Sequence, residues 1–317
     1  VNMHGIQTSG NTIRNITSEA LEGIAPDGIV DTRPFAEILR QWSTLHPEFA
    51  FLPRKFKIAF NGAAEDRAAT GWYDIGLQAQ KNDAGEVGFT VKVGGGMGRT
   101  PVIGTVVRDF LPWAELLNFV EAVVRVYNRY GRRDNKWKAR IKILVKAEGQ
   151  KFIDEVEAEY RAIVEQDGAP HTISPAELAR VQASFVEPTL RAADLPSQID
   201  TATKPYQRWL AQNVRAHRQP ELAIVTLSFK RLGWAPGDAD ADTLDALAEL
   251  ADTFSAGEAR LTHEQNLLLP WVHQTDLPAL YERAKALGLA QANIGLLTDM
   301  IACPGGDFCS LANARAI

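Results

Sequence analysis

Hydrophobic and polar positions alternate with a period of two along two stretches in the first half of the chain. The stretch 55–60 (KFKIAF) ends at Asn61-Gly62, and the stretch 86–93 (EVGFTVKV) ends in three consecutive glycines. Both patterns predict strands closed by turns. From Pro112 to Gly131 the apolar residues recur at helical spacing, and another helix is predicted over 150–164. The first half therefore mixes strands and helices.

The pattern changes after residue 164. Residues 165–205 are polar and contain five prolines, which favours a connector with one short helix near 176–183. From Tyr206 onward apolar runs return. They predict a buried strand over 222–229, a helix through 243–254, strand-like stretches at 260–262 and 266–269, and a helix from Asp276 to Gly288. This β-α-β-β-α order is typical of a ferredoxin-like half-domain and makes the fold class α+β.

Charge is unevenly divided along the chain. The net charge is −5, yet residues 1–150 contain 20 Lys and Arg against 16 Asp and Glu, whereas residues 151–317 contain 14 against 23. The first half is therefore the better place for an anion site, although two ordinary solvated surfaces give the same numbers. The basic stretch 132–146 matches no nucleic-acid module, so we expect no nucleic-acid partner. An acidic electron donor, cofactor carboxylates or plain solvent would each suit it.

The only two cysteines, Cys303 and Cys309, flank a Pro-Gly-Gly loop. So few cysteines favour a reducing cytoplasm over a secreted disulfide framework, and no apolar run predicts a membrane span. Two thiolates on one tight loop suit an iron–sulfur cluster, but they supply only two of its four ligands. Two buried cysteines without a function are an equally good interpretation. Zinc is less suitable because no His or Cys follows at finger spacing.

Lys55 and Lys57 lie two residues apart on a predicted strand and so share a face. Two ammonium groups placed in this way can bind an oxyanion and supply it with protons, although a solvated strand face is the commoner explanation. The segment 8–15 (TSGNTIRN) is rich in donors, among them Thr8, Asn11 and Arg14, and would suit a ligand with several carboxylates. An ordinary polar turn is the alternative.

Gly94, Gly95 and Gly96 follow a predicted strand. The segment lacks the Gly-Lys-Ser/Thr ending of a nucleotide-binding loop and the spacing of a dinucleotide-binding loop. Close approach of the backbone to a flat cofactor fits better, with a flexible turn as the alternative. His263-Glu264 lacks the second histidine of a zinc protease motif, which excludes that class.

Taken together, several segments resemble the sirohaem- and [4Fe–4S]-dependent sulfite and nitrite reductase family, in the order that the family has them. These segments are TSGNTIRN (8–15), LPRKFKIA (52–59), VGGGMGRTP (93–101), YGRRDNKWKARIKILV (130–145), RLTHEQNLLLP (260–270) and IACPGGDFCSLANARAI (301–317). The family consists of two pseudo-symmetric repeats, each with a ferredoxin-like half-domain and a larger α/β domain. The resemblance implies a first α/β domain over 1–165, a connector over 166–205, a half-domain over 206–288 and the start of a cluster-binding domain over 289–317.

The resemblance also implies roles for individual residues. Arg14 matches a substrate-binding arginine, and Lys55 and Lys57 match two active-site lysines. Cys303 and Cys309 match the first pair of cluster ligands. The segments that contact sirohaem would include Thr8, Asn11, Gly94, Gly95 and Gly96.

The implied activity is the six-electron reduction of sulfite to sulfide at sirohaem coupled to a [4Fe–4S] cluster, with nitrite to ammonia as the alternative. Ferredoxin or a flavoprotein would donate the electrons. The family's second cysteine pair, C-x₃-C, has no counterpart here. We therefore expect an internal fragment, without the first half-domain and the C-terminal part, that is inactive alone. Two other hypotheses are a fragment that folds without cofactors and a zinc or redox module that uses the two thiols.

Overall fold

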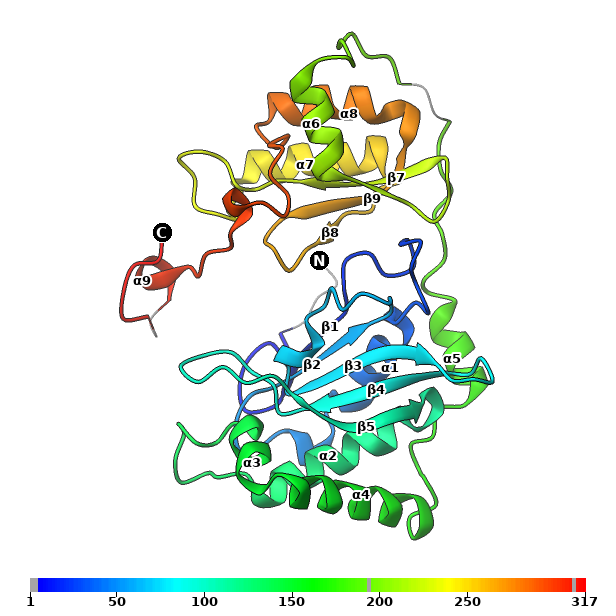
Figure 1. The fold of residues 1–317 in the computed structure, drawn as a ribbon, viewed down its shortest axis with the longest axis vertical. Helices are drawn as coiled ribbons and strands as arrows, with labels where there is room; N and C mark the ends of the chain where they lie inside the picture. The colour runs from blue at the N-terminus through cyan, green and yellow to red at the C-terminus, as the bar shows by residue number, and fades with distance from the viewer. Residues whose placement is uncertain (1–4, 193–194, 310–311) are drawn as a thin grey trace. The chain divides into compact units, whose positions relative to one another are not determined.

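The computed structural model describes residues 5–192, 195–309 and 312–317. These residues form two compact units, and each is described by itself. Unit 1 contains residues 5–23 and 27–186, and unit 2 contains residues 24–26 and the described residues from 187 onward. Figure 1 shows both units as ribbons.

Unit 1 is built on a five-stranded sheet in the order β1-β2-β3-β4-β5. Strands β1, β2 and β3 are parallel to one another, whereas β4 and β5 extend the sheet in antiparallel fashion. The strands are β1 (Ile13–Thr17), β2 (Phe56–Asn61), β3 (Ile75–Lys81), β4 (Val87–Val93) and β5 (Thr105–Pro112). Because β1 to β3 are parallel, the residues at their starts lie along one edge of the sheet.

One face of this sheet carries the apolar residues and is covered by helices (Figure 1). The rings of Phe56, Phe60 and Phe89 come from three strands. Phe56 contacts Tyr127 on one helix, and Phe89 contacts Phe35 on another. The helices are α1 (Arg33–Ser43), α2 (Leu116–Tyr130), α3 (Ile141–Glu148), α4 (Gln150–Glu165) and α5 (Pro175–Gln182), with short 3₁₀ turns η1 (Pro47–Phe49), η2 (Thr70–Trp72) and η3 (Trp113–Glu115).

The opposite face of the sheet is polar because side chains alternate along each strand. Gln78 and Gln80 on β3, and Thr90 and Lys92 on β4, lie on it, and Gln80 Nε2 donates to Thr90 Oγ1 across the strands at 2.9 Å. Unit 1 therefore has one apolar face that holds it together and one face equipped for polar contacts.

Unit 2 has a four-stranded antiparallel sheet in the order β6-β7-β9-β8. Its elements are α6 (Lys204–Asn213), β6 (Val214–Ala216), β7 (Leu222–Leu227), α7 (Ala241–Phe254), β8 (Arg260–Leu261), β9 (Leu267–His273), η4 (Gln274–Asp276) and α8 (Leu277–Ala286). The three helices share one core on one side of the sheet, where the rings of Tyr206, Trp209 and Tyr281 meet. The β-α-β-β-α order expected from the sequence is present.

Two expectations change in detail. Residues 166–186, expected as connector, belong to unit 1, where Ile173 and Val181 are buried in the core. Ser174 caps α5 by accepting a hydrogen bond from Glu177 N at 3.1 Å. The basic stretch 132–146 overlaps α3, which begins at Ile141 and which the sequence did not predict, although Lys and Arg are good helix formers.

Beyond α8 the described chain contains only η5 (Leu297–Asp299) and α9 (Gly305–Phe308). Ser310 and Leu311, which belong to the cysteine segment, lie outside the described residues. Among the described helices, none has both the length and the apolar character that crossing a membrane requires.

Candidate functional site

The structure brings the predicted cations of unit 1 together. Ile13 pairs with Phe56 across the parallel strands β1 and β2, so their neighbours Arg14 and Lys57 lie at the same edge of the sheet. Lys55 precedes β2, and the electrostatic influence of Arg14 and Lys57 reaches it. We call Arg14, Lys55, Lys57 and Arg140 the cationic cluster.

Asp74 is the buried carboxylate at the base of this cluster. It immediately precedes β3, and its side chain is fully buried. Its Oδ2 accepts a hydrogen bond from the backbone N–H of Lys57 at 2.9 Å, and its Oδ1 accepts from Arg140 Nη2, also at 2.9 Å. Burial raises the pKa of Asp74, whereas Arg140 lowers it. Asp74 is thus a carboxylate that lies beside the four cations of the cluster, and it forms an ion pair with Arg140.

The two lysines carry charge without a partner. Within the part of the chain that the structure describes, neither Lys55 nor Lys57 has a carboxylate within ion-pair distance or a hydrogen bond from its ammonium group. Burial lowers the pKa of Lys55, and the nearby charges of Lys57, Arg14, Arg140 and Arg54 lower it further. A lysine with a lowered pKa gives up a proton more readily near neutral pH.

The segment 8–15 is partly loop and partly strand, because β1 begins at Ile13. Thr8 and Asn11 are exposed. Thr8 Oγ1 donates to Gly5 O at 2.8 Å, and Arg14 Nε donates to Gly10 O at 3.0 Å. The second bond orients Arg14 and leaves the other edge of its guanidinium group for a ligand. No observation tests contact of Thr8 or Asn11 with a cofactor, which stays a prediction.

The protein's own packing requires glycine at 94 and 95, and at 96 it leaves room for a neighbouring side chain. Gly94 has a φ of +86°, which favours glycine. A Cβ on Gly95 would lie 2.2 Å from the carbonyl oxygen of Gly71, and one on Gly96 would lie 2.8 Å from Arg140 Nη2. Close approach of backbone, expected from the sequence, is therefore present, but within the chain. Approach to a cofactor stays a prediction.

Lys142 stabilises the loop that contains these glycines through hydrogen bonds from its ammonium group. Its side chain is buried, and its Nζ donates to the carbonyl oxygens of Thr100 at 2.6 Å, Met97 at 3.1 Å and Gly96 at 3.4 Å. Burial and Arg140 lower the pKa of Lys142. Arg140 and Lys142 belong to the basic stretch 132–146, which was expected to lie on the surface. Their side chains instead bind Asp74 and the glycine loop, and so attach the start of α3 to residues next to the sheet.

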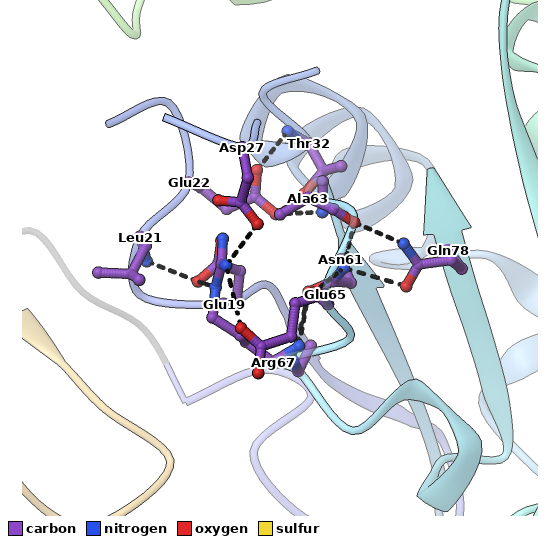
Figure 2. Close-up of polar contacts among 12 residues, drawn as sticks. Glu19, Leu21, Glu22, Asp27, Thr32, Asn61, Ala63, Glu65, Arg67 and Gln78 are labelled. Atoms are coloured by element: carbon purple, nitrogen blue, oxygen red, sulfur yellow. Dashed lines mark hydrogen bonds and ion pairs between the residues drawn. The ribbon is translucent and has the colours of Figure 1, made fainter. Parts of the chain in front are cut away.

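A second polar group lies near the other end of β2 (Figure 2). We call Glu19, Glu22, Asp27, Asn61 and Arg67 the acidic network. Arg67 pairs with Glu19 and with Asp27, each at 2.8 Å. Its backbone N–H donates to Asn61 Oδ1 at 3.1 Å. Sequence reasoning did not single out this network, since its members are spread over about fifty residues of ordinary polar sequence.

Glu22 is the most perturbed acid of this network. Its carboxylate accepts hydrogen bonds from Thr32 N at 2.9 Å, from Thr32 Oγ1 at 2.6 Å and from Gly62 N at 2.8 Å. Burial nevertheless raises the pKa of Glu22 to about 7. The network thus connects the segment before α1 to the end of β2. These connections indicate that its role is to stabilise unit 1.

The two cysteines of unit 2 are both free thiols. Cys303 is exposed and Cys309 is partly buried. They flank the short helix α9, whose last turn closes with a bond from Cys309 N to Gly305 O at 2.9 Å. Accessible thiols on one turn suit shared metal ligation better than the interpretation of two buried cysteines.

The segment 260–270 positions the start of this cysteine loop. Gln265 Nε2 donates to Ala302 O at 2.8 Å and Gln265 Oε1 accepts from Ala302 N at 3.0 Å, directly before Cys303. Asp299 is bound by Lys230 at 3.1 Å and by Asn266 Nδ2 at 2.8 Å. The sequence did not predict that this segment positions the cysteine loop. Side-chain contacts between residues more than thirty positions apart leave no local pattern in the sequence.

These residues fit the expected groups to different degrees. The unpaired cations of the cationic cluster fit an oxyanion or the carboxylates of a tetrapyrrole. The cysteine loop fits an iron–sulfur cluster in ligand type, but two thiols are half of the four that such a cluster takes, and the sequence has no others.

Two family models match the chain. The model described as "Nitrite and sulphite reductase 4Fe-4S domain" matches residues 9–163. The model described as "Nitrite/Sulfite reductase ferredoxin-like half domain" matches residues 226–287. The first match includes the whole cationic cluster, and the second lies in unit 2 between α6 and Gly288.

Several relatives match over nearly the whole chain. A chloroplastic ferredoxin–nitrite reductase of Arabidopsis thaliana is 29% identical over 98% of this chain and 49% of that protein. A ferredoxin sulfite reductase of Mycolicibacterium paratuberculosis is 27% identical over 98% of this chain and 50% of that protein. The solved structure of the Mycobacterium tuberculosis NirA protein matches with a TM-score of 0.70 and 26% identity, over 98% of this chain and 50% of that one. The chain spans about half the length of these relatives, and the likeness confirms the α+β fold.

Proposed function

The chain belongs to the sirohaem- and [4Fe–4S]-containing nitrite and sulfite reductase family, and we propose that it serves the six-electron reduction of sulfite to sulfide. Reduction of nitrite to ammonia is the second candidate, because a relative named nitrite reductase is 29% identical to the chain, whereas the relative named sulfite reductase is 27% identical. The observation that carries the proposal is the convergence of Arg14, Lys55 and Lys57 at the starts of two adjacent parallel strands.

The cationic cluster suits the binding of a small oxyanion. Arg14 would supply the free edge of its guanidinium group to two anion oxygens, and the two ammonium groups would balance the remaining charge. Asp74 and Arg140 already form a pair, so the cluster keeps its shape without an anion. A site that is preorganised in this way loses little entropy on binding.

Proton supply is the second task of the cluster. Each oxygen that leaves sulfite or nitrite departs as water and consumes protons. Lys55 is suited to deliver them, because burial and neighbouring cations lower its pKa. Lys57 would hold the anion in position while Lys55 donates, and the two lysines could exchange these tasks through water.

Two sets of residues in this chain would bind the two cofactors. Thr8, Asn11 and Gly94 to Gly96 would hold sirohaem, and Cys303 and Cys309 would hold the cluster together with two further thiolates. When bound, the two groups would supply the redox chemistry of the reduction. Since two further thiolates are needed, we expect the 317-residue chain alone to bind anions without turnover.

Electron supply follows from the names of the relatives. Several of them are ferredoxin-dependent enzymes, and we propose a ferredoxin as donor, with a flavoprotein as the alternative. The exposed arginines before α3, at 132 and 133, would suit an acidic donor surface.

The test uses two preparations. The chain is produced in cells that make sirohaem, and its visible absorption is titrated with sulfite and with nitrite. A holoenzyme with a complete cluster is then assayed with reduced methyl viologen for sulfide and for ammonia. We expect Lys57→Met to lower the turnover of the preferred anion about 100-fold, the low end of general acid–base effects. Lys81→Met, on an exposed lysine at the far end of β3, is the matched control.

Two results would contradict the proposal. A chain that stays colourless in the presence of sirohaem would remove the cofactor assignment. Equal turnover in wild type, Lys57→Met and Lys81→Met would remove the cationic cluster from the reaction. The ratio of sulfide to ammonia production at equal anion concentration decides between the two candidate substrates.

A further inference from the structure

Three side chains that are far apart in the sequence converge in unit 1, outside the six short segments on which the family resemblance was based. His46 lies between α1 and η1, Glu121 lies in the middle of α2, and His171 lies between α4 and α5. One potential ligand atom from each lies within 4.8 Å of the other two. The proposed reductase activity gives these three residues no task.

The contact between Glu121 and His171 is close but is not a hydrogen bond. His171 Nε2 lies 2.9 Å from Glu121 Oε2, yet that buried oxygen has no hydrogen-bond partner among the described residues. Two ligand atoms that share one cation behave in this way, because each directs its lone pair at the cation rather than at the other atom. A carboxylate that is 1% exposed would otherwise leave an acceptor unsatisfied.

The other oxygen of Glu121 is already held. Its Oε1 forms an ion pair with Arg125 Nη2 at 2.7 Å. This contact orients the carboxylate and leaves Oε2 as the atom directed towards the histidines. A ligating carboxylate that is fixed by a neighbour through its second oxygen is the usual arrangement at metal sites.

His46 contributes a second unsatisfied atom. Its Nδ1 is buried without a hydrogen-bond partner among the described residues. Its ring stacks on Phe49 with centroids 3.8 Å apart, and Trp42 lies 5.2 Å from it. A ring nitrogen that is buried and has no hydrogen-bond partner is available to a metal ion.

The loop that carries His171 is fixed to α2 next to Glu121. Asn118, one turn earlier on α2, accepts a hydrogen bond from His171 N at 3.0 Å and donates one to Thr172 Oγ1 at 3.0 Å. Asn118 is fully buried. The position of His171 over the helix is thus set by the backbone and does not depend on the ring contact.

The charge around the three residues suits a dication. Arg125 lies among four carboxylates, since it also contacts Glu159 at 3.3 Å and both Glu48 and Asp167 at 3.7 Å. Arg129 pairs with the same Glu159 at 2.9 Å. Four carboxylates against two guanidinium groups leave an excess of negative charge that a dication would balance.

We propose that His46, Glu121 and His171 bind a divalent cation of the zinc type, with a fourth position taken by water. Two histidines and one glutamate are an established zinc ligand set, with bonds of about 2.0–2.2 Å. Ligand atoms around tetrahedral zinc are then about 3.4 Å apart. The pair His171 Nε2 and Glu121 Oε2, at 2.9 Å, would therefore open slightly on binding, and any longer separation would close. The cation would connect the turn after α1 and the loop before α5 to α2, and stabilise unit 1.

The test begins from the full chain with Cys303→Ser and Cys309→Ser, which removes the thiols as competing ligands. The metal-free protein is dialysed against zinc, and bound zinc per chain is measured. We expect one zinc, and binding at least about 100-fold weaker in His46→Gln and in His171→Gln. His263→Asn, on an exposed histidine of unit 2, should bind zinc like its parent.

Cobalt provides a readout that does not depend on the stability of the variants. Cobalt in the thiol-free chain should show the visible bands of a four-coordinate site with nitrogen and oxygen ligands. The proposal fails if those bands are absent from the folded thiol-free chain, or if zinc affinity is the same in both histidine variants. Zinc should also raise the melting temperature of the parent and leave that of His171→Gln unchanged. Neither readout involves sirohaem or turnover, so the reductase proposal can fail independently.

Discussion

Unit 1 contains two groups of charged residues at different places along β2, the acidic network and the cationic cluster. They differ in whether their charges have partners. In the acidic network every charged group has a partner: Arg67 bonds Glu19 and Asp27, and Glu22 accepts three hydrogen bonds (Figure 2). In the cationic cluster Lys55 and Lys57 have none among the described residues. Removal of one partner from a buried pair leaves an uncompensated charge and destabilises the fold, whereas partly exposed like charges contribute little to stability and are typical of sites that bind an oppositely charged ligand.

The comparison separates residues that stabilise the fold from residues that bind the anion. Substitutions in the acidic network should lower the free energy of unfolding, whereas substitutions in the cationic cluster should lower anion affinity. Hydrogen exchange at the amides of β2 reports the stability of unit 1 for both groups, because β2 passes between them.

The largest effect is expected for Arg67→Met. The carboxylate of Glu19 is 3% exposed and would lose its partner, so we expect unit 1 to lose about 3–5 kcal/mol. Urea denaturation combined with hydrogen exchange at β2 measures this loss. Arg132→Met, in an exposed pair with Asp134, is the control and should cost less than about 1 kcal/mol. A similar small loss for Arg67→Met would show that the network is not structural.

A pH dependence of about 3 kcal/mol is expected from Glu22. Its pKa is raised from 4.5 to about 7 in the folded chain, so its stabilising contribution is complete below pH 4.5 and is lost as the pH rises to about 7. The free energy of unfolding of unit 1, followed from pH 4.5 to 8, measures this loss. Glu22→Gln should be less stable throughout but should remove this part of the slope. An unchanged slope would contradict the assignment.

Lys142→Met should cost about 2 kcal/mol. The methionine fills the space of the lysine stem, but the carbonyl oxygens of Met97 and Thr100 lose their donor. Denaturation measures the loss, and increased hydrogen exchange between Gly94 and Val102 should accompany it. If exchange there stayed at the wild-type rate, Lys142 would not be what holds the glycine loop.

The same substitution at Lys55 should change stability least. Lys55→Met removes a cation that has only like-charged neighbours, so the free energy of unfolding should stay within about 0.5 kcal/mol of wild type. Sulfite affinity, measured by calorimetry, should fall about tenfold, the value of one charge-assisted hydrogen bond. Equal anion affinity in Lys55→Met and wild type would erase the contrast between the two groups.

Sequence reasoning was strongest where contacts are local. The helix over 150–164, the strand before Asn61 and the order of elements in unit 2 all follow from apolar spacing and turn residues, and the structure has them. It was weaker where tertiary contacts override local pattern. Strands β1 and β3 were not predicted, since pairing with neighbouring strands stabilises these short segments, β1 on one side and β3 on both. Helix α3 was not predicted either.

The same distinction applies to the sites. Lys55 and Lys57 were identifiable because a strand places alternate residues on one face, and Cys303 and Cys309 because one tight loop carries both. The positioning of Cys303 by Gln265, and of Arg140 by Asp74, depends on contacts between distant segments. No local spacing records such contacts.

The sequence by itself determined the family, the α+β class and the chemical types at the two candidate sites, because those depend on residue identity and on the short-range periods of helix and strand. Only the tertiary structure decided which charges are paired, which glycines are required by packing, and that His46, Glu121 and His171 meet. Those outcomes depend on contacts between segments that are distant in the sequence, such as Glu19 with Arg67 and His46 with Glu121, and the packing of the elements fixes such contacts whereas no spacing along the chain does.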